Sequence, residues 1–187
     1  MALRVIAGEA GGRRLVAPKG DTRPTADRVK ESLFASLGAD RLQGATVLDL
    51  YAGSGALGIE ALSRGAASAI FVEDDRQSAE AIEKNLAKTN LQGRVRDQDV
   101  FDFLRQRSNA DKFQIIFADP PYEKSQHDEN CTEKLLRSET LAQLLEPGGI
   151  FVLEKRPTER LAEMKAWKTI RQKTYGATEV LFLSTAN

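Results

Sequence analysis

The sequence predicts an α/β fold in which a mostly parallel sheet carries helices on both faces, preceded by a small N-terminal appendage. From residue 46 onward, short apolar runs of strand length alternate with amphipathic stretches of helical period. A glycine-rich turn joins the first of these runs to the first helix of the alternating region. Repeated strand–helix units form parallel sheets with right-handed crossovers. We therefore divide the chain into an appendage, residues 1–40, and a main domain, residues 41–187.

The appendage is predicted to hold a small β-hairpin followed by a helix. Residues 3–6 and 14–17 have the pattern of short strands, and glycines lie between them. Thr25 is a candidate N-cap for a helix whose apolar stripe ends at Gly38. Seven cations against three acids lie within residues 1–30, in a chain whose net charge is zero. This excess indicates either a phosphate-binding surface or a solvated basic face with no partner.

The main domain is predicted to alternate strands with helices and to end in a hairpin. The last two strands are divided at Gly176 and are expected to add antiparallel pairing at one edge of the sheet. The expected strands are residues 46–50, 69–72, 94–96, 113–118, 150–153, 167–174 and 179–183; the expected helices are residues 56–64, 76–90 and 131–145, with a further helix starting after Asp99.

Composition excludes several classes of protein. The chain has 187 residues, of which 41% are hydrophobic and 29% are charged, as in soluble globular proteins. With a single cysteine, Cys131, and a single histidine, His127, we expect neither an internal disulfide nor a metal site. Without a long apolar run or a signal-peptide pattern, we expect a cytoplasmic protein with no membrane partner.

The glycine-rich turn is the first candidate ligand site. Gly53, Gly55 and Gly58 fit the pattern G-x-G-x-x-G, which allows a tight turn and close approach of the backbone to a ligand. The free amides at the start of the following helix face that ligand. The alternative is a turn that joins strand to helix for packing alone. Asp49 precedes the first glycine by four residues, so it would repel a pyrophosphate and attract a cationic ligand.

A second acid follows the next apolar run. Glu73 lies twenty residues after Gly53, the spacing at which an acid accepts hydrogen bonds from ribose hydroxyls. Together Asp49 and Glu73 suit S-adenosylmethionine better than NAD, with Asp49 near the methionine end and Glu73 on the ribose.

The fourth apolar run ends in Asp119-Pro120-Pro121-Tyr122. Two prolines hold a stiff loop whose carbonyl oxygens stay free as acceptors. Asp119 and the Pro120 carbonyl would accept hydrogen bonds from an exocyclic amino group, and Tyr122 would stack on the ring that carries it. The alternative is an ordinary turn. No covalent intermediate is needed, so we assign Cys131 no role.

These four residues resemble the D/N-P-P-Y/F motif of S-adenosylmethionine-dependent amino methyltransferases. The resemblance implies that Asp119, Pro120 and Tyr122 are catalytic. The implied cofactor-binding residues are Asp49, Tyr51, Gly53, Ser54, Gly55, Glu73, Asp74, Asp99 and Val100, with Asp99 on the adenine amino group.

The N-terminal segments Arg4–Gly8, Gly12–Leu15 and Arg23–Phe34 resemble the bacterial 16S ribosomal RNA guanine-N2 methyltransferase family. The resemblance implies a Rossmann-like class I methyltransferase fold with seven strands. It also implies that a monomeric enzyme methylates guanine 966 of 16S rRNA within an assembling small subunit. The implied RNA-binding residues are Arg4, Arg13, Arg14, Arg23, Thr25 and Arg28.

Other readings stay open at this point. The same tetrapeptide chemistry serves adenine-N6 in nucleic acids and glutamine-N5 in proteins, although glutamine enzymes usually carry Asn where this chain has Asp119. DNA enzymes typically insert a recognition domain for which this chain has no room. A non-catalytic RNA-binding assembly factor on the same fold is the alternative from another class, and an NAD-dependent oxidoreductase is disfavoured. His127 either touches substrate or lies exposed in a polar loop.

Overall fold

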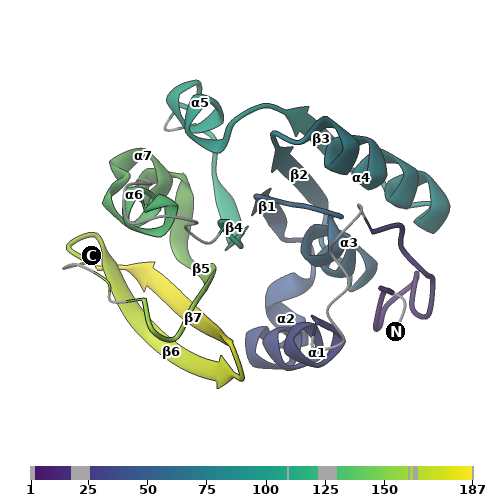
Figure 1. Ribbon diagram of the computed structural model, residues 1–187, viewed down its shortest axis with the longest axis horizontal. Helices are drawn as coiled ribbons and strands as arrows, with labels where there is room; N and C mark the ends of the chain where they lie inside the picture. The colour runs from purple at the N-terminus through teal and green to yellow at the C-terminus, as the bar shows by residue number, and fades with distance from the viewer. Residues whose placement is uncertain are drawn as a thin grey trace.

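The computed structural model describes residues 3–17, 26–108, 110–121, 130–159, 161 and 164–186. Its centre is a seven-stranded sheet in the order β3-β2-β1-β4-β5-β7-β6 (Figure 1). Strands β1 to β5 pair in parallel, β7 runs antiparallel to β5, and β6 runs antiparallel to β7. The predicted mostly parallel sheet is thus confirmed. The strands are β1 (Thr46–Leu50), β2 (Ser68–Glu73), β3 (Arg94–Asp97), β4 (Phe113–Ala118), β5 (Leu145–Lys155), β6 (Trp167–Tyr175) and β7 (Thr178–Thr185).

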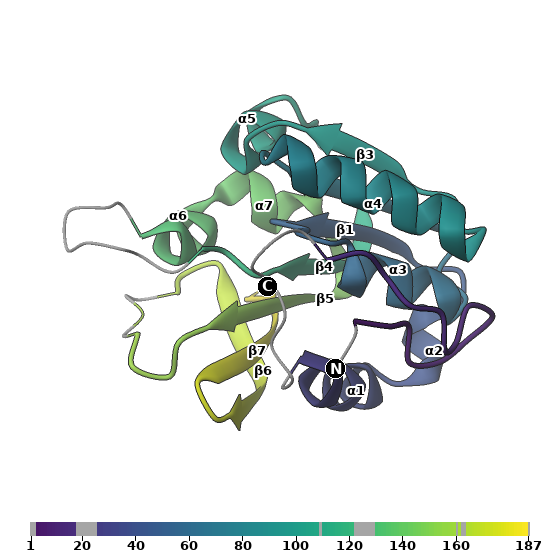
Figure 2. The ribbon, with the colours of Figure 1, turned by 45° about the vertical axis from the view of Figure 1, so that its right-hand side comes forward.

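Helices cover both faces of this sheet, as Figure 2 shows from the side. Helices α1 to α4 lie on one face and α5 to α7 on the other, because their apolar residues join two different buried clusters. The helices are α1 (Ala26–Leu37), α2 (Ala39–Leu42), α3 (Ala56–Ser63), α4 (Arg76–Thr89), α5 (Val100–Arg105), α6 (Cys131–Arg137) and α7 (Glu139–Leu144). In the described ranges, no helix is long and apolar enough to cross a membrane.

The two clusters arise from the alternation of side chains along the central strands. Val47 and Phe117 point to the face of α1 to α4, whereas Leu48 and Ile116 point to the face of α5 to α7. All four side chains are fully buried. A strand that is buried on both faces is apolar at most positions, which is why β1 and β4 are apolar apart from Thr46, Asp49 and Gln114.

The segment before β5 differs from the prediction of one helix over residues 131–145. Ser138 has extended backbone dihedrals and divides the segment into α6 and α7. Its hydroxyl accepts a hydrogen bond from the backbone N–H of Leu141 at 3.1 Å, so it caps the second helix. Strand β5 then begins at Leu145 and runs through Pro147-Gly148-Gly149, which makes it longer than the predicted residues 150–153.

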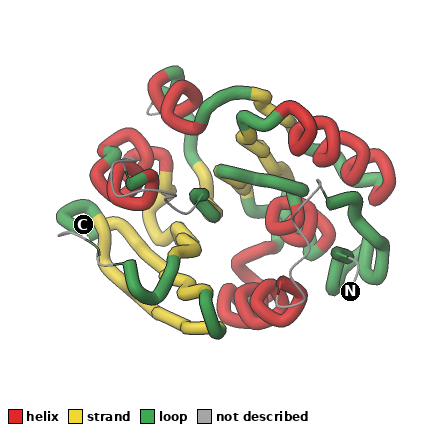
Figure 3. The backbone as a smooth tube through the Cα atoms, in the orientation of Figure 1, coloured by secondary structure: helices red, strands yellow, loops and turns green. Residues whose placement is uncertain are grey.

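The predicted pairing of the two N-terminal segments is confirmed, but it is shorter than a regular hairpin of two strands. The segment does turn back on itself, but a single antiparallel bridge joins Arg4 to Arg14, and no strand forms in residues 3–17. Figure 3 shows this part of the chain as loop. The N–H groups of Val5 and Leu15 donate to the carbonyl oxygens of Arg13 and Leu3 across the turn, and other backbone donors of the segment bind α3. The N–H groups of Ile6 and Ala7 donate to the Glu60 carboxylate, and Ala10 N–H donates to the Ser63 hydroxyl.

The predicted helix of the appendage is confirmed as α1. Val29, Leu33, Phe34 and Leu37 are buried as its apolar stripe, and they join the cluster that also holds Val47 and other strand residues. The proposed cap, Thr25, lies outside the described residues. The division of the chain at residue 40 remains a proposal.

Candidate active site

A cavity of about 490 Å³ opens at the carboxyl ends of β1, β2, β4 and β5. Parallel sheets bind ligands at this edge, because the loops that leave the strands converge there. The structure brings most of the predicted site residues together at this place. Those that line the cavity are Asp49, Tyr51, Gly53, Ser54, Glu73, Asp74, Asp119 and Pro120.

Asp49 ends β1 and lies at the bottom of the cavity, 2% exposed. Its Oδ2 accepts a hydrogen bond from the backbone N–H of Gly58 at 2.8 Å, which ties the strand to the first turn of α3. Burial raises the pKa of the Asp49 carboxyl to about 8, while the Gly58 bond lowers it and the nearby Asp119 and Glu73 raise it further. A cationic group placed beside this carboxyl would favour its ionised form.

Glu73 ends the neighbouring strand β2 and supports the glycine-rich turn. Its Oε2 accepts from Gly53 N–H at 2.7 Å, and its Oε1 accepts from Asp75 N–H at 3.0 Å. Burial raises the pKa of Glu73, and these two backbone bonds oppose that effect. Each carboxylate oxygen has a second lone pair, so both can still accept a hydroxyl from a ligand in the cavity.

The three glycines of the motif have different structural roles. Gly53 has a positive φ of 54° and lines the cavity, whereas Gly55 and Gly58 do not line it. Gly58 is required for packing, because a Cβ there would lie 2.3 Å from Cε1 of Phe71 and 3.0 Å from Oδ2 of Asp49. Gly55 begins α3 in the left-handed region with φ 75°. Of the three glycines, Gly53 is therefore the one that can approach a ligand in this cavity.

Tyr51 is the residue whose surroundings best fit an absent ligand. It has a positive φ of 54°, which is uncommon for an aromatic residue and turns the chain out of β1. Its buried hydroxyl lies near the Cys131 thiol, a weak hydrogen-bonding group, and among the described residues it bonds to no oxygen or nitrogen. Burial, with Cys131 and the acids Asp99 and Asp74 nearby, raises its pKa, so the group stays a neutral donor. An unsatisfied buried donor beside acidic groups suits a polar cofactor in this cavity.

The loop after β4 lines the cavity with its first three residues. Pro120 is buried, whereas Asp119 and Pro121 are exposed, and all three line the cavity. Asp119 also acts electrostatically on Asp49, as its effect on the Asp49 pKa shows. The predicted stacking residue, Tyr122, lies outside the described residues.

Asp99 and Val100 lie after β3 and do not line this cavity. The Asp99 carboxylate caps α5, where Oδ1 accepts from the N–H groups of Phe101 at 2.8 Å and Asp102 at 2.9 Å. The predicted helix after Asp99 is confirmed as α5. The predicted contact of Asp99 with an adenine amino group remains a proposal.

Two charged residues at the cavity escaped the sequence analysis. Glu154 lines it from the carboxyl end of β5. It follows an apolar run just as Asp49 and Glu73 do, so the same signal could have found it. Lys30 lines it from α1 and is 4% exposed. It shares the helix face of Phe34 and Leu37, where a lysine is out of place unless it is paired.

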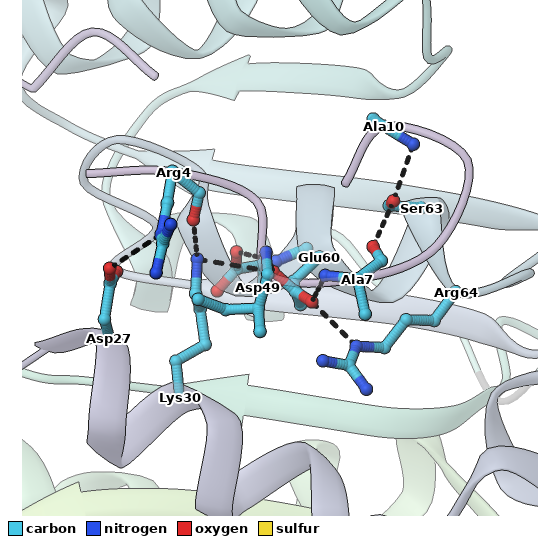
Figure 4. Close-up of polar contacts among 11 residues, drawn as sticks. Arg4, Ala7, Ala10, Asp27, Lys30, Asp49, Glu60, Ser63 and Arg64 are labelled. Carbon is cyan, nitrogen blue, oxygen red and sulfur yellow. Dashed lines mark hydrogen bonds and ion pairs between the residues drawn. The ribbon is translucent and has the colours of Figure 1, made fainter. Parts of the chain in front are cut away.

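Lys30 belongs to a buried network around Glu60, which is 0% exposed (Figure 4). The Lys30 ammonium donates to the Arg4 carbonyl oxygen at 2.5 Å and lies 3.4 Å from Oε2 of Glu60. Arg64 Nε donates to the other Glu60 oxygen at 2.7 Å. Burial lowers the pKa of Lys30, and the Glu60 carboxylate opposes that effect. The network holds the N-terminal segment against α3, next to the cavity.

The predicted RNA-binding cations of the N-terminus lie at the surface. Arg4, Arg13, Arg14 and Arg28 are exposed. Arg4 Nε lies 3.3 Å from Asp27, and Arg13 donates to the Lys88 carbonyl oxygen at 2.7 Å. The remaining two predicted residues, Arg23 and Thr25, lie outside the described residues. In the described ranges, no group of three or more His, Cys, Asp or Glu side chains is arranged to hold a metal ion.

The strand order, with β7 running against its neighbours, and the acid-lined cavity at the strand ends define the Rossmann-like fold of the class I methyltransferases. Residues 3–184 match the family described as Conserved hypothetical protein 95, and the chain belongs to that family.

Named relatives agree with this assignment. The chain is 35% identical to "Ribosomal RNA small subunit methyltransferase D" of Haemophilus influenzae, over 93% of this chain and 89% of the relative. It is 39% identical to "Putative rRNA methyltransferase YlbH" of Bacillus subtilis, over 95% of this chain and 96% of the relative. Relatives this similar over most of both chains place the chain in a methyltransferase family that uses S-adenosylmethionine.

Solved structures show the same fold. A putative methyltransferase from Escherichia coli superposes with a TM-score of 0.80 at 30% identity, over 99% of this chain and 98% of the other. The 16S rRNA N2 G1207 methyltransferase of Thermus thermophilus, in complex with AdoMet and guanosine, superposes with a TM-score of 0.68 at 27% identity. That match covers 89% of this chain and 44% of the other.

Proposed function

We propose that this protein transfers a methyl group from S-adenosylmethionine to the exocyclic N2 of a guanine in 16S rRNA, guanine 966. The observation that carries the proposal is one cavity that holds Asp119 and Pro120 together with Asp49 and Glu73. The names of the two relatives support an rRNA substrate. The AdoMet and guanosine in the Thermus thermophilus neighbour support a cavity of this kind for both compounds.

Three acids that line the cavity, together with Asp99, would bind different parts of the cofactor. Asp49, buried at the end of β1, would face the positively charged methionine end, and Glu73 would accept hydrogen bonds from the ribose hydroxyls. Asp74 would border the ribose, and Asp99 at the start of α5 would lie toward the adenine. The sulfonium of the bound cofactor supplies the methyl group.

Asp119 and Pro120 would handle the guanine. The N2 lone pair is delocalised into the ring, which makes the free amino group a poor nucleophile. By accepting its N–H bonds, the Asp119 carboxylate and the Pro120 carbonyl oxygen would favour a pyramidal nitrogen and stabilise its developing positive charge. Because the loop with Pro120 and Pro121 is stiff, it positions the base with little loss of freedom on binding. Tyr122 would stack on the base from the same loop.

The N-terminal cations would bind RNA phosphates next to this site. Arg4, Arg13 and Arg14 are exposed on the segment that Glu60 and Lys30 hold beside the cavity, and Arg28 is exposed on α1. Arg23 and Thr25 complete the proposed surface. We further propose that the enzyme acts as a cytoplasmic monomer on an assembling small subunit, because one small domain would need ribosomal proteins to present the base.

Labelled methyl transfer tests the reaction directly. Tritiated S-adenosylmethionine is supplied with small-subunit particles from a strain that lacks the protein, and the RNA is digested to nucleosides. We expect label in N2-methylguanosine, and mapping should place it at the proposed guanine. Label in N6-methyladenosine would keep the fold and the roles of Asp119 and Pro120 but would overturn the assigned base. Cofactor binding without label in any RNA would contradict the proposal.

Replacing Asp119 tests the proposed chemistry. Asp119→Ala should lower kcat about 100-fold, since removal of one group that stabilises transition-state charge commonly costs that much. Cofactor affinity should change little. Asp40→Ala is the matched control, because Asp40 is an exposed acid on α2 that does not line the cavity. Near wild-type turnover of Asp119→Ala would show that Asp119 has another role.

A further inference from the structure

The edge strand β6 carries a row of cations that the site above does not use. Residues 164–178 hold four cations, Lys165, Lys168, Arg171 and Lys173, and no acid, although the chain as a whole has 27 of each sign. Among the described residues, none of the four forms an ion pair. A local charge of +4 on a neutral protein is therefore left open to solvent and to an anionic partner.

A β-bulge places three of these cations on one face of the sheet. Side chains alternate along a strand, so Lys168 and Arg171, three residues apart, would ordinarily point to opposite faces. The register shifts between Thr169 and Arg171, however, and Ile170 is the extra residue. Lys168 then pairs with Ser184, Arg171 with Phe182 and Lys173 with Val180.

Those β7 partners identify the face. Val180 and Phe182 belong to the cluster on the side of α1 to α4, whereas their neighbours Leu181 and Leu183 belong to the other side. Directly opposed residues of an antiparallel pair share a face, so Lys168, Arg171 and Lys173 all lie on the side of α1. We call these three residues the β6 cation row. Bulges commonly re-aim side chains in this way.

Contacts with α1 confirm this placement and show that the row runs along α1 toward the cavity. Arg171 Nη1 lies 3.5 Å from the Ser36 carbonyl oxygen, and the Lys173 ammonium lies 3.4 Å from the Ser32 hydroxyl. The Tyr175 hydroxyl also bonds to Ser32, at 2.5 Å. Beyond Tyr175, Thr178 lines the cavity. Figure 1 shows this end of β6 beside α1.

The exposed surface of the row suits a polyanion. Lys168 and Arg171 are exposed, Lys173 is half-buried, and Ile170 at the bulge is 54% exposed. The exposed acid among the described residues of α1 is Glu31. The acid at the start of β7, Glu179, lies on the opposite face of the sheet and forms an ion pair with Lys155 at 2.7 Å. Cations on one face of a strand repeat at roughly 6.6 Å, which lets several contact one extended phosphate backbone.

We propose that the β6 cation row binds the sugar-phosphate backbone of the RNA substrate and, with Arg28 on α1, guides it across α1 to the cavity. This inference rests on the proposed RNA substrate and adds a second docking surface, far in sequence from the N-terminal cations. Lysine on an edge strand also discourages pairing with another chain. Since that duty needs neither the bulge nor a shared face, it does not account for the arrangement.

The test compares two charge-neutralised edge strands. Arg171→Gln/Lys173→Gln removes two cations from β6, and Arg94→Gln/Arg96→Gln removes two exposed cations, spaced alike, from β3 at the opposite edge of the sheet. The affinity of each protein for an unmodified 16S rRNA transcript is measured by filter binding at several salt concentrations between about 50 and 200 mM. Size-exclusion chromatography checks that the variants keep the oligomeric state of the wild type.

In the β6 variant, the slope of log affinity against log salt should fall by about 1.4, since each lost phosphate contact accounts for about 0.7 with single-stranded nucleic acid. Adding Lys168→Gln should lower it further. The β3 variant should keep the wild-type slope, and cofactor affinity should stay unchanged in both. The proposed role of the β6 cation row would be contradicted if the wild type and both variants had equal slopes. It would also be contradicted if both variants lost the same amount of slope. RNA binding by the wild type without any methyl transfer would overturn the proposed function while leaving the row intact.

Discussion

At the residue scale, the site depends on acids that the fold buries before any ligand arrives. Asp49 is 2% exposed, and its pKa of about 8 means that the ligand-free protein keeps this group largely protonated at neutral pH. The unfolded chain, in which the carboxyl has its ordinary value of 3.8, is ionised under the same conditions. Between these two values the folded state holds a proton that the unfolded state lacks. The contribution of Asp49 to the free energy of unfolding should therefore fall as the pH rises from about 4 to about 8.

Binding of a cationic ligand should reverse that protonation. If the positive end of S-adenosylmethionine lies beside Asp49, binding at pH 7 should release close to one proton, and the release should vanish well above pH 8. Calorimetry in buffers of different ionisation enthalpy measures it. Asp49→Asn is the control, because it keeps an acceptor for Gly58 N–H and has no proton to lose. The difference between the two proteins isolates Asp49 from the amino group of the ligand, and identical proton release in both would exclude the contact.

At the scale of elements, the N-terminal segment is held by its contacts with α3 as well as by its own short pairing. Glu60 receives the N–H groups of Ile6 and Ala7, the Arg64 guanidinium and the Lys30 ammonium, although it is fully buried. Gly8 packs so closely on Ser63 that a Cβ there would lie 1.7 Å from the Ser63 carbonyl oxygen. The segment thus follows the surface of α3 and brings its arginines to the side of the cavity.

Removing Glu60 should release this segment. Glu60→Ala leaves Lys30 buried without its carboxylate and two backbone N–H groups without acceptors, which should lower the free energy of unfolding by about 3–5 kcal/mol. Glu80→Ala on α4 removes an acid that is 52% exposed and should cost no more than about 0.5 kcal/mol. Urea unfolding gives both values.

Amide exchange locates the effect of the same change. In Glu60→Ala, the amides of Ile6 and Ala7 should lose their protection while those of β1 and β4 keep theirs. Unchanged protection at Ile6 and Ala7 would mean that the segment is held by its apolar contacts, such as Val5, and not by Glu60.

At the scale of the whole molecule, equal numbers of cations and acids are sorted onto different surfaces. Acids collect at the carboxyl ends of the strands, where the cavity lies, and cations collect on the N-terminal segment and on β6. The pI of about 6.6 is an average over separate surfaces, one that suits a cationic cofactor and others that suit an anionic RNA. Both surfaces meet at α1, which supplies Val29 and Lys30 to the cavity and carries Arg28 outside.

Ligand binding to the folded state alone should raise its melting temperature. S-adenosylmethionine at 100 times its Kd should stabilise the protein by about 2.7 kcal/mol. For a chain of this length, that corresponds to a shift of roughly 5–10 °C. NAD at the same concentration should give no shift, because its pyrophosphate would meet the acids that line the cavity. Differential scanning fluorimetry distinguishes the two, and a shift with NAD alone would contradict the assigned cofactor.

Much of the fold and part of the site could be predicted because their signals are local. Apolar runs located the strands, and the residues that end those runs, Asp49, Glu73 and Asp119, do line one cavity. Glu154 carries the same signal, and its place at the cavity follows from the same rule. The break at Ser138 was missed because a serine inside an amphipathic pattern is compatible with both a continuing helix and a new cap.

The sequence by itself determined the layered α/β architecture, the strand ends at which chemistry is placed and the family, because each depends on residues close together in the chain. Only the tertiary structure decided where the N-terminal donors go, what Lys30 pairs with and which face the β6 cations share. Glu60 lies more than fifty residues from Ile6, and the bulge at Ile170 exists through its pairing with β7. Contacts between such distant residues form only when the sheet has brought their elements together, so no local pattern records them.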